Sequence, residues 1–225
     1  MVIALFDIDG TLMLGSKLKD EIAYPTAFRE IYGLDVNIDD INRKGKTDKE
    51  IIVGLLRKNG LDDEKIYSKL EAFMNKMVEI FNKNLDSDEF DVFESVPKFL
   101  SRLNGCGVVM GLVTGNLEPI AWGILEKTGL KHYFKFGAFG TDDSDRNNLA
   151  KTALIRAKEL GFESSDVFLF GDAPQDMQAG KFIGAVTIGV TTGSYSKTDL
   201  MNAGADHVFE NLGDTEIIEF VVESK

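Results

Sequence analysis

The chain has 225 residues, 44% of them hydrophobic, which is enough apolar material to bury a core and argues against wholesale disorder. Its 37 acidic and 25 basic side chains leave a formal net charge of -12. Because nucleic acids and anionic membrane surfaces bind proteins through clustered cations, this charge argues against both as the main partner. The single cysteine, Cys106, and only two histidines exclude an internal disulfide framework and a Cys/His zinc site.

The chain starts with a short apolar run, Val2–Phe6, which lacks a preceding basic region and is followed at once by aspartates. This pattern is not that of a signal peptide. No apolar run approaches the roughly 20 residues that a membrane-spanning helix needs. We therefore expect a cytoplasmic protein.

Short apolar runs alternate with helical patterns along most of the chain. The expected strands are Val2–Phe6, Val108–Val113, Phe134–Phe139, Val167–Phe170, Ala185–Val190 and a weaker His207–Phe209. The expected helices between them are Val96–Leu103, Pro119–Thr128, Leu149–Leu160, Pro174–Ile183 and Lys197–Ala203. Strands that are apolar throughout are typical of a parallel sheet covered on both faces. We predict an α/β fold with a doubly wound, Rossmann-like parallel sheet, and a ligand site at the carboxyl ends of its strands.

The stretch between Gly15 and Glu89 departs from this alternation, because it has helical periodicity and no convincing strand. An insert of ~75 residues is much longer than an ordinary loop. We predict that residues 15–90 form an all-helical cap domain over the strand ends, inserted into a core made of residues 1–14 and 91–225. The helices expected in it are Tyr24–Tyr32, Asp48–Arg57 and Asp62–Leu85, with Asp48 and Asp62 as N-caps.

Two aspartates, Asp7 and Asp9, directly follow the first strand. In an extended chain, side chains two residues apart point the same way, so both carboxylates would lie at one edge of the sheet. Such a pair is costly to bury without a cation or hydrogen bonds. The alternative is an Asx turn that ends the strand, with Gly10 in the turn, and the pair alone does not decide between the two.

A later strand, Val167–Phe170, also ends in acidic residues, with Asp172 just after it and Asp176 near the start of the next helix. These two residues could simply cap that helix and complement its dipole. Together with Asp7 and Asp9, however, Asp172 would gather three carboxylates at one sheet edge. Ligands that offer only oxygen suit a hard divalent cation, and Mg²⁺ is the obvious candidate.

The strand Val108–Val113 is followed by Thr114, Gly115 and Asn116. A hydroxyl and free backbone N–H groups at this point form an anion site, although Thr-Gly-Asn is also a common turn. A metal site and an oxyanion site that meet at three strand ends predict phosphoryl transfer.

These motifs, in this order and spacing, resemble the haloacid dehalogenase (HAD) superfamily. The resemblance spans residue 1 to about 210 and rests on Asp7-x-Asp9-Gly10-Thr11, on Thr114 after an apolar strand, and on Gly171-Asp172-x-x-x-Asp176. Within the superfamily the chain resembles the phosphoglycolate-phosphatase-like branch, whose helical cap lies between the first two motifs. The stretch Gly45–Glu50 resembles the substrate-facing loop of that cap.

The resemblance implies a Mg²⁺-dependent phosphatase that acts on a small-molecule phosphate ester, such as a phosphoglycolate-like compound or a sugar phosphate. Asp7 would attack phosphorus and form an aspartyl-phosphate, and Asp9 would protonate the leaving oxygen and then activate water. The phosphoryl oxygens would be held by Thr114 and by the backbone of Gly115 and Asn116. The implied metal ligands are Asp7, the main-chain carbonyl of Asp9, Asp172 and, through water, Asp176.

The family pattern also includes a lysine, usually followed by proline, before the helix Leu149–Leu160, and this chain has no Lys-Pro. The corresponding place falls at Asn147, next to Arg146, while Lys151 lies about a turn farther on. Because arginine can hold both a carboxylate and a phosphoryl oxygen, we expect Arg146 to take this role, with Lys151 as the alternative.

Two other functions stay open. A phosphosugar mutase of the same superfamily would return the phosphoryl group to a sugar instead of water, and no residue of the insert signals one. A binding protein that keeps the fold without turnover is disfavoured, because all four carboxylates are present: Asp7, Asp9, Asp172 and Asp176.

Overall fold

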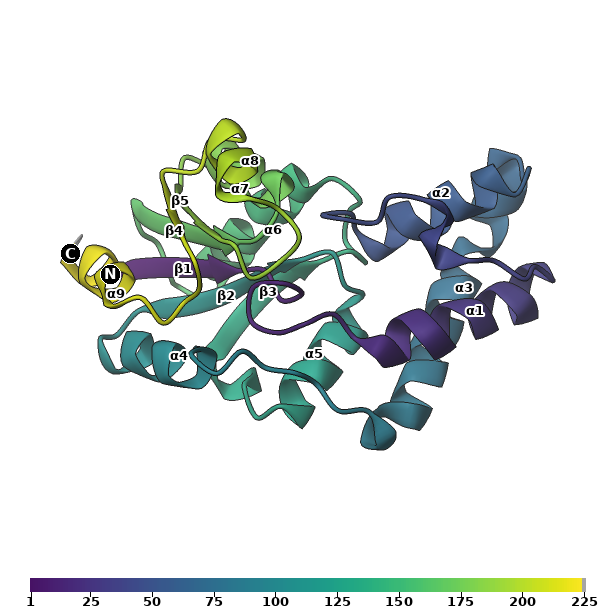
Figure 1. The fold of residues 1–225 in the computed structure, drawn as a ribbon, viewed down its shortest axis with the longest axis horizontal. Helices are drawn as coiled ribbons and strands as arrows, with labels where there is room; N and C mark the ends of the chain where they lie inside the picture. Colours follow the sequence, from purple (N-terminus) through teal and green to yellow (C-terminus); the bar gives the residue numbers. More distant parts are fainter. Residues whose placement is uncertain (224–225) are drawn as a thin grey trace.

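The computed structural model describes residues 1–223, in which six parallel strands form one sheet (Figure 1). The strands are β1 (Val2–Phe6), β2 (Val109–Thr114), β3 (Phe134–Phe139), β4 (Asp166–Gly171), β5 (Val186–Val190) and β6 (His207–Phe209). Their spatial order is β3-β2-β1-β4-β5-β6. The predicted doubly wound parallel sheet is confirmed, and each strand ends within one residue of its expected bounds.

Strand β1 is buried on both of its faces, as its unbroken apolar sequence predicts. Val2, Ala4 and Phe6 pack into the core on one side of the sheet. Ile3 and Leu5 pack into a second core on the other side. Successive side chains therefore point to opposite faces of the sheet, as the two-residue period of a strand requires.

Helices cover both faces of the sheet (Figure 1). One face carries α6 (Arg146–Glu159) and α7 (Pro174–Phe182), and the other carries α4 (Val96–Gly105), α5 (Glu118–Lys127) and α9 (Thr215–Glu223). The short α8 (Lys197–Asn202) packs beside β5 and β6.

The sequence did not predict α9. The signal was present, because Ile217 and Val221 lie one turn apart and are both buried, while glutamates at helical spacing mark the opposite face.

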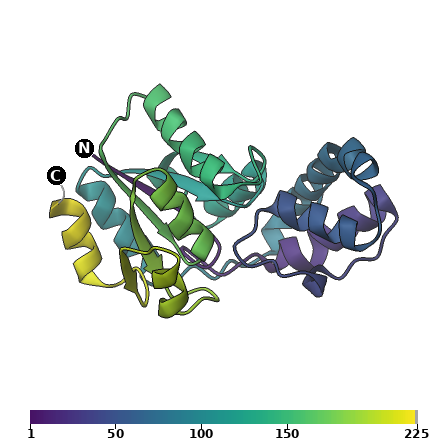
Figure 2. The same cartoon turned by 90° about the horizontal axis from the view of Figure 1, so that it is seen from above.

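The residues between β1 and α4 include a group of helices that lies to one side of the core (Figure 2). We call residues 19–87 the helical segment. It contains the short α1 (Tyr24–Ala27) between π-helical turns at Lys19–Ala23 and Phe28–Tyr32, followed by α2 (Asp48–Lys58) and α3 (Asp63–Asn84). The helical stretch therefore starts at Lys19, one turn earlier than expected. That residues 15–90 form a separate domain stays a prediction.

Three side-chain caps bear on the predicted elements. Asp62 caps α3 as predicted, since its carboxylate accepts from the Lys65 N–H. The expected cap of α2 is wrong, because Thr47 and not Asp48 is its N-cap and forms a reciprocal capping box with Glu50. This leaves the Asp48 carboxylate available for other partners.

The third cap sets the position of Arg146, a candidate site residue, at the start of α6. Asp145 caps α6 by accepting from the Asn147 N–H, so α6 begins at Arg146, three residues before its expected start.

The centre of the sheet is a topological switch point. From β1 the chain continues outward through β2 and β3, whereas from β4 it continues in the opposite direction through β5 and β6. In such sheets the connections diverge at the carboxyl ends of the two central strands and leave a crevice for a ligand. Asp7 and Asp172 directly follow β1 and β4, whose last residues pair in register as Phe6 with Phe170.

An aromatic cluster beneath this crevice supports both strand ends. Phe6 stacks on Phe170 with ring centroids 4.6 Å apart, and Phe99 meets both rings edge to face. We expect Phe170→Ala to lower the free energy of unfolding by about 3–5 kcal/mol, because it opens a large cavity in a packed core. Urea denaturation measures this. Phe182→Ala is the control, since Phe182 is 58% exposed and its truncation should change stability by no more than about 0.5 kcal/mol.

Candidate active site

Three buried carboxylates meet at the carboxyl edge of the sheet. Asp7 follows β1, Asp172 follows β4, and Asp176 lies in the first turn of α7. Each contributes one oxygen to a group in which these oxygens lie within 4.8 Å of one another. The sheet order brings together residues that are far apart in the sequence, as the motif spacing predicts.

Arg146 is the cation of this cluster. Its Nη1 lies 3.1 Å from Asp7 Oδ1 and 2.7 Å from Asp176 Oδ1, and its side chain is only 7% exposed. Its Nε is buried without a hydrogen-bond partner in the part of the chain that the structure describes. The alternative cation, Lys151, lies exposed on α6. The structure therefore places Arg146 in the candidate site and Lys151 outside it.

Burial is the main cause of the unusual acidities in this cluster. Burial and the charges of Asp7 and Asp176 raise the pKa of Asp172 to about 8. Burial also raises the pKa of Asp176 to about 7, against the lowering effect of Arg146. The pKa of Asp7 is raised by burial as well, again opposed by Arg146.

The charges of the cluster fit a divalent cation. Three ionised carboxylates and one guanidinium carry -3 + 1 = -2, and a buried charge of that size is costly unless a cation compensates it. The donors are all oxygens, which suits Mg²⁺.

Two glycines allow the backbone to approach Asp172 closely. Gly10 has a φ of +84°, and a Cβ at this position would lie 2.5 Å from Asp172 Cγ. A Cβ at Gly193, in the loop after β5, would also overlap the Asp172 carboxylate. Asp172 is therefore enclosed by backbone from two loops, and this fixes its position opposite Asp7.

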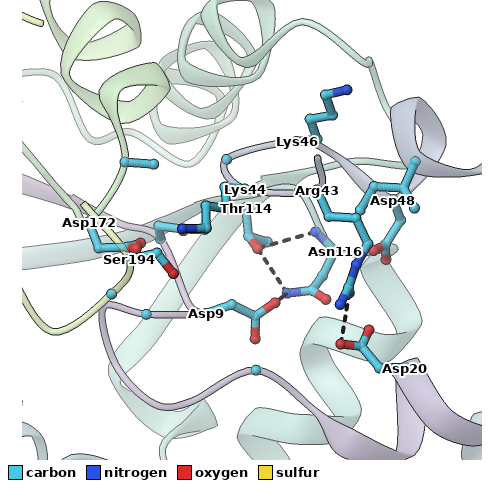
Figure 3. Close-up of a pocket in the computed structure, with 18 of the residues that line it drawn as sticks. Asp9, Asp20, Arg43, Lys44, Lys46, Asp48, Thr114, Asn116, Asp172 and Ser194 are labelled. Carbon is cyan, nitrogen blue, oxygen red and sulfur yellow. Dashed lines mark hydrogen bonds and ion pairs between the residues drawn. The ribbon is translucent and has the colours of Figure 1, made fainter. Parts of the chain in front are cut away.

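The Asp9 carboxylate is not part of this group and instead lies beside Asn116 and Thr114 at the end of β2 (Figure 3). Its Oδ2 accepts a 2.9 Å hydrogen bond from Asn116 Nδ2, and the same amide donates to Thr114 Oγ1 over 3.1 Å. Asp9 Oδ1 is buried and has no hydrogen-bond partner among the described residues. The sequence-predicted residues Asp9, Thr114 and Asn116 are thus connected, and one acid oxygen stays available.

The helical segment supplies one wall of a cavity of about 560 Å³ above these residues. Arg43, Lys44 and Lys46 line this wall, and Ser194 lines the opposite side from the loop after β5 (Figure 3). The approach is close at Gly115, where a Cβ would lie 2.8 Å from the Lys46 carbonyl oxygen. The stretch Gly45–Glu50, which includes the first turn of α2, therefore lies against the strand ends. That it faces a substrate stays a prediction.

Asp48 connects the helical segment to the core. Its backbone N–H donates to the Gly115 carbonyl over 2.8 Å, and its Oδ2 accepts from the Leu117 N–H over 3.0 Å. Its Oδ1 accepts from the Tyr24 hydroxyl over 2.7 Å. The residue that the sequence suggested as a helix cap is instead a buried link between the two parts of the chain.

Sequence analysis missed Lys19, the first residue of the helical segment. Its side chain is buried, and its Nζ lies 3.2 Å from Asp48 Oδ1 and 3.4 Å from Asp9 Oδ2. Burial opposes its charge, but the carboxylates of Asp48 and Asp9 raise the pKa of the Lys19 ammonium above its usual range. No sequence signal separates it from the exposed Lys17, because π-helical turns shift the helical phase here.

A family model described as haloacid dehalogenase-like hydrolase matches residues 4–190. The chain belongs to this family. Among its relatives, it is 21% identical to the phosphoglycolate phosphatase of Salmonella choleraesuis over 182 residues, which are 81% of this chain and 72% of that protein. It is 25% identical to 2-deoxyglucose-6-phosphate phosphatase 1 of Saccharomyces cerevisiae, over 96% of this chain and 90% of that protein.

The fold is shared with solved structures as well. A candidate β-phosphoglucomutase from Bacteroides vulgatus aligns with a TM-score of 0.67 at 20% identity, over 100% of this chain and 89% of that chain. The resemblance to the haloacid dehalogenase superfamily, and within it to the phosphoglycolate-phosphatase-like branch, is thus confirmed. Within residues 1–223, no helix is both long enough and apolar enough to cross a bilayer.

The raised pKa of Asp172 predicts how the stability of the metal-free protein depends on pH. The folded protein keeps a proton on Asp172 that the unfolded chain loses near its ordinary pKa of 3.8, so the free energy of unfolding falls as the pH rises toward 8. We expect Asp172→Asn to raise the metal-free melting temperature at pH 8 by at least roughly 2–4 °C, or about 1 kcal/mol. It should also remove the stabilisation that added Mg²⁺ gives.

Thermal melts at pH 5 and pH 8, in EDTA and in Mg²⁺, measure both effects. The exposed Asp91 supplies the control, since Asp91→Asn should leave the pH dependence and the response to Mg²⁺ unchanged. Identical melting of the Asp172 variant and the wild type at pH 8 in EDTA would contradict the prediction.

Proposed function

We propose that this protein is a Mg²⁺-dependent phosphatase that hydrolyses small phosphorylated metabolites through an aspartyl-phosphate. The observation that carries the proposal is the position of Asp7, which lies buried at the switch point, paired with Arg146 and beside the other two carboxylates of the cluster. Relatives named as phosphatases over most of the chain support an enzyme of the phosphoric monoester hydrolase class.

The reaction has two steps, and the chain has residues for both. In the first, an Asp7 carboxylate oxygen forms a bond to phosphorus while the bond from phosphorus to the leaving oxygen breaks. The leaving oxygen keeps the bonding electron pair and takes a proton from Asp9 Oδ1, which has no hydrogen-bond partner among the described residues. In the second, Asp9 takes a proton from water, whose oxygen attacks phosphorus and releases phosphate and the Asp7 carboxylate.

The transferred group would be held by groups that surround Asp7. Within residues 1–223, Arg146 Nε has no hydrogen-bond partner, and Thr114 Oγ1 lies at the end of the neighbouring strand β2. With the backbone N–H groups of Gly115 and Asn116, these donors would stabilise negative charge on the phosphoryl oxygens.

The proposed metal ligands are Asp7, the main-chain carbonyl of Asp9 and Asp172, with Asp176 holding a bound water. When bound, Mg²⁺ would neutralise charge on the phosphoryl oxygens. The chain's own part is to hold these carboxylates in place, which the Arg146 ion pairs to Asp7 and Asp176 and the enclosing backbone of Gly10 and Gly193 around Asp172 support.

The cavity favours a small and polar leaving group. Its helical wall carries Arg43, Lys44 and Lys46, and of these only Arg43 is paired with carboxylates within the described residues. Phosphoglycolate-like compounds and sugar phosphates fit this size and chemistry. We propose that the helical segment acts as a cap that covers the substrate and excludes water, as the contacts of Asp48 with Gly115 and Leu117 support.

The nucleophile assignment predicts that Asp7→Asn loses at least about 10³-fold of the phosphate release while the protein keeps its fold. The assay measures phosphate from an aryl phosphate and from a panel of small metabolite phosphates, in Mg²⁺ and in EDTA. EDTA should abolish wild-type release. Full Mg²⁺-dependent turnover by Asp7→Asn would show that another group attacks phosphorus.

The same panel separates hydrolysis from mutase activity. A folded wild-type protein that binds Mg²⁺ but releases no phosphate from any ester would contradict the phosphatase. Phosphoryl transfer between paired sugar phosphates would then identify the mutase.

The choice of cation predicts different effects for two neighbouring residues on α6. Arg146→Ala should lower kcat/KM by about 10²–10³-fold, because it removes a charged donor from the phosphoryl group. Lys151→Ala should leave activity unchanged, since Lys151 is exposed. Steady-state kinetics of the two variants test this, and the reverse ranking would move the role to Lys151.

A further inference from the structure

Lys19 lies where the helical segment meets the candidate acid/base residue Asp9. Its ammonium has three partners, which are Asp9 Oδ2, Asn116 Oδ1 and Asp48 Oδ1. An ammonium has three N–H donors, so these partners use all of them and leave none for a substrate. Lys19 therefore contacts the catalytic machinery without a free group for catalysis.

The contact with Asn116 determines which way that amide points. An ammonium has no acceptor, so the side of the amide that faces Lys19 must be its oxygen. Asn116 Nδ2 is then directed at Asp9 Oδ2 and Thr114 Oγ1, to which it donates over 2.9 and 3.1 Å. Without Lys19 the amide could turn over and place its oxygen against the Asp9 carboxylate.

Asp48 in turn holds Lys19 in place. Asp48 is 2% exposed, and the Tyr24 hydroxyl and the Leu117 N–H occupy its carboxylate oxygens beside Lys19. A buried charge pair with these additional hydrogen bonds has little freedom to rearrange. The position of the ammonium thus depends on the contact between the helical segment and the core.

We propose that Lys19 is the positioning residue for Asp9. It binds Asp9 Oδ2 directly and orients the Asn116 amide that binds the same oxygen, so that Asp9 Oδ1 is the oxygen left to exchange a proton with the leaving group. This role rests on the proposed phosphatase function. It also makes proton transfer depend on the helical segment, which carries both Lys19 and Asp48.

The test is the dependence of kcat/KM on the leaving group, because kcat/KM reports on the step that breaks the ester bond. A series runs from p-nitrophenyl phosphate, whose leaving oxygen needs little protonation, to an alkyl phosphate, whose oxygen needs a proton. We expect Lys19→Met to lower kcat/KM by about 10²-fold or more for the alkyl ester and by less than about 10-fold for the nitrophenyl ester. Lys17→Met is the matched control, because Lys17 is exposed and two residues away.

Lys19→Met would leave the buried Asp48 carboxylate without its cation, and this could unfold the protein. A second variant keeps the test valid in that case. Lys19→Met combined with Asp48→Asn removes both charges of the pair, and it should show the same steeper dependence on the leaving group. An equal loss for every ester, or no loss, would overturn the positioning role alone. A wild-type protein that releases no phosphate from any ester would overturn the phosphatase itself and this role with it.

Discussion

The site depends on one buried arrangement, in which the Arg146 guanidinium bridges Asp7 and Asp176 beside Asp172. Three carboxylates cannot stay ionised together in an apolar interior without compensation, and a single guanidinium leaves a charge of -2. The raised pKa values of Asp172 and Asp176 reflect that deficit. Burying this cluster therefore costs stability, and that cost fits the proposed binding of a divalent cation.

The sheet makes this cluster possible. β1 and β4 pair in register at the centre, and the stack of Phe6 on Phe170 fixes the strand ends from which Asp7 and Asp172 project. Because the chain continues outward in opposite directions from this pair, the connections diverge at the strand ends and leave a crevice there. Apolar packing in the sheet thus determines the geometry of a polar site above it.

The helical segment completes the site through a few buried polar contacts. Asp48 is satisfied by Lys19, Tyr24 and Leu117, and only Leu117 belongs to the core. The same network reaches Asp9 through Lys19. The contact between the two parts of the chain and the arrangement of Asp9, the proposed acid/base residue, therefore depend on the same network. A change on either side should affect the other.

Local patterns determined much of this protein. The fully apolar strands predicted the parallel sheet, and motif order brought Asp7, Asp172 and Asp176 to one edge, because strand ends in such a sheet share that edge. Spacing also pointed to Arg146. The predicted elements did not extend past β6 and so missed α9, although the apolar residues of α9 do recur at helical spacing.

Other features were decided only by tertiary structure. Lys19 and Lys17 look alike in the sequence, and only packing against Asp48 and Asp9 buries one of them. Asp48 looks like a helix cap in the sequence, yet Thr47 is the N-cap of α2. The Asp48 carboxylate instead accepts a hydrogen bond from the core residue Leu117. The sequence by itself determined the strands, most of the helices and the motifs, because these depend on residues that are close together in the chain. Contacts between residues far apart in the sequence were decided only by how the elements pack.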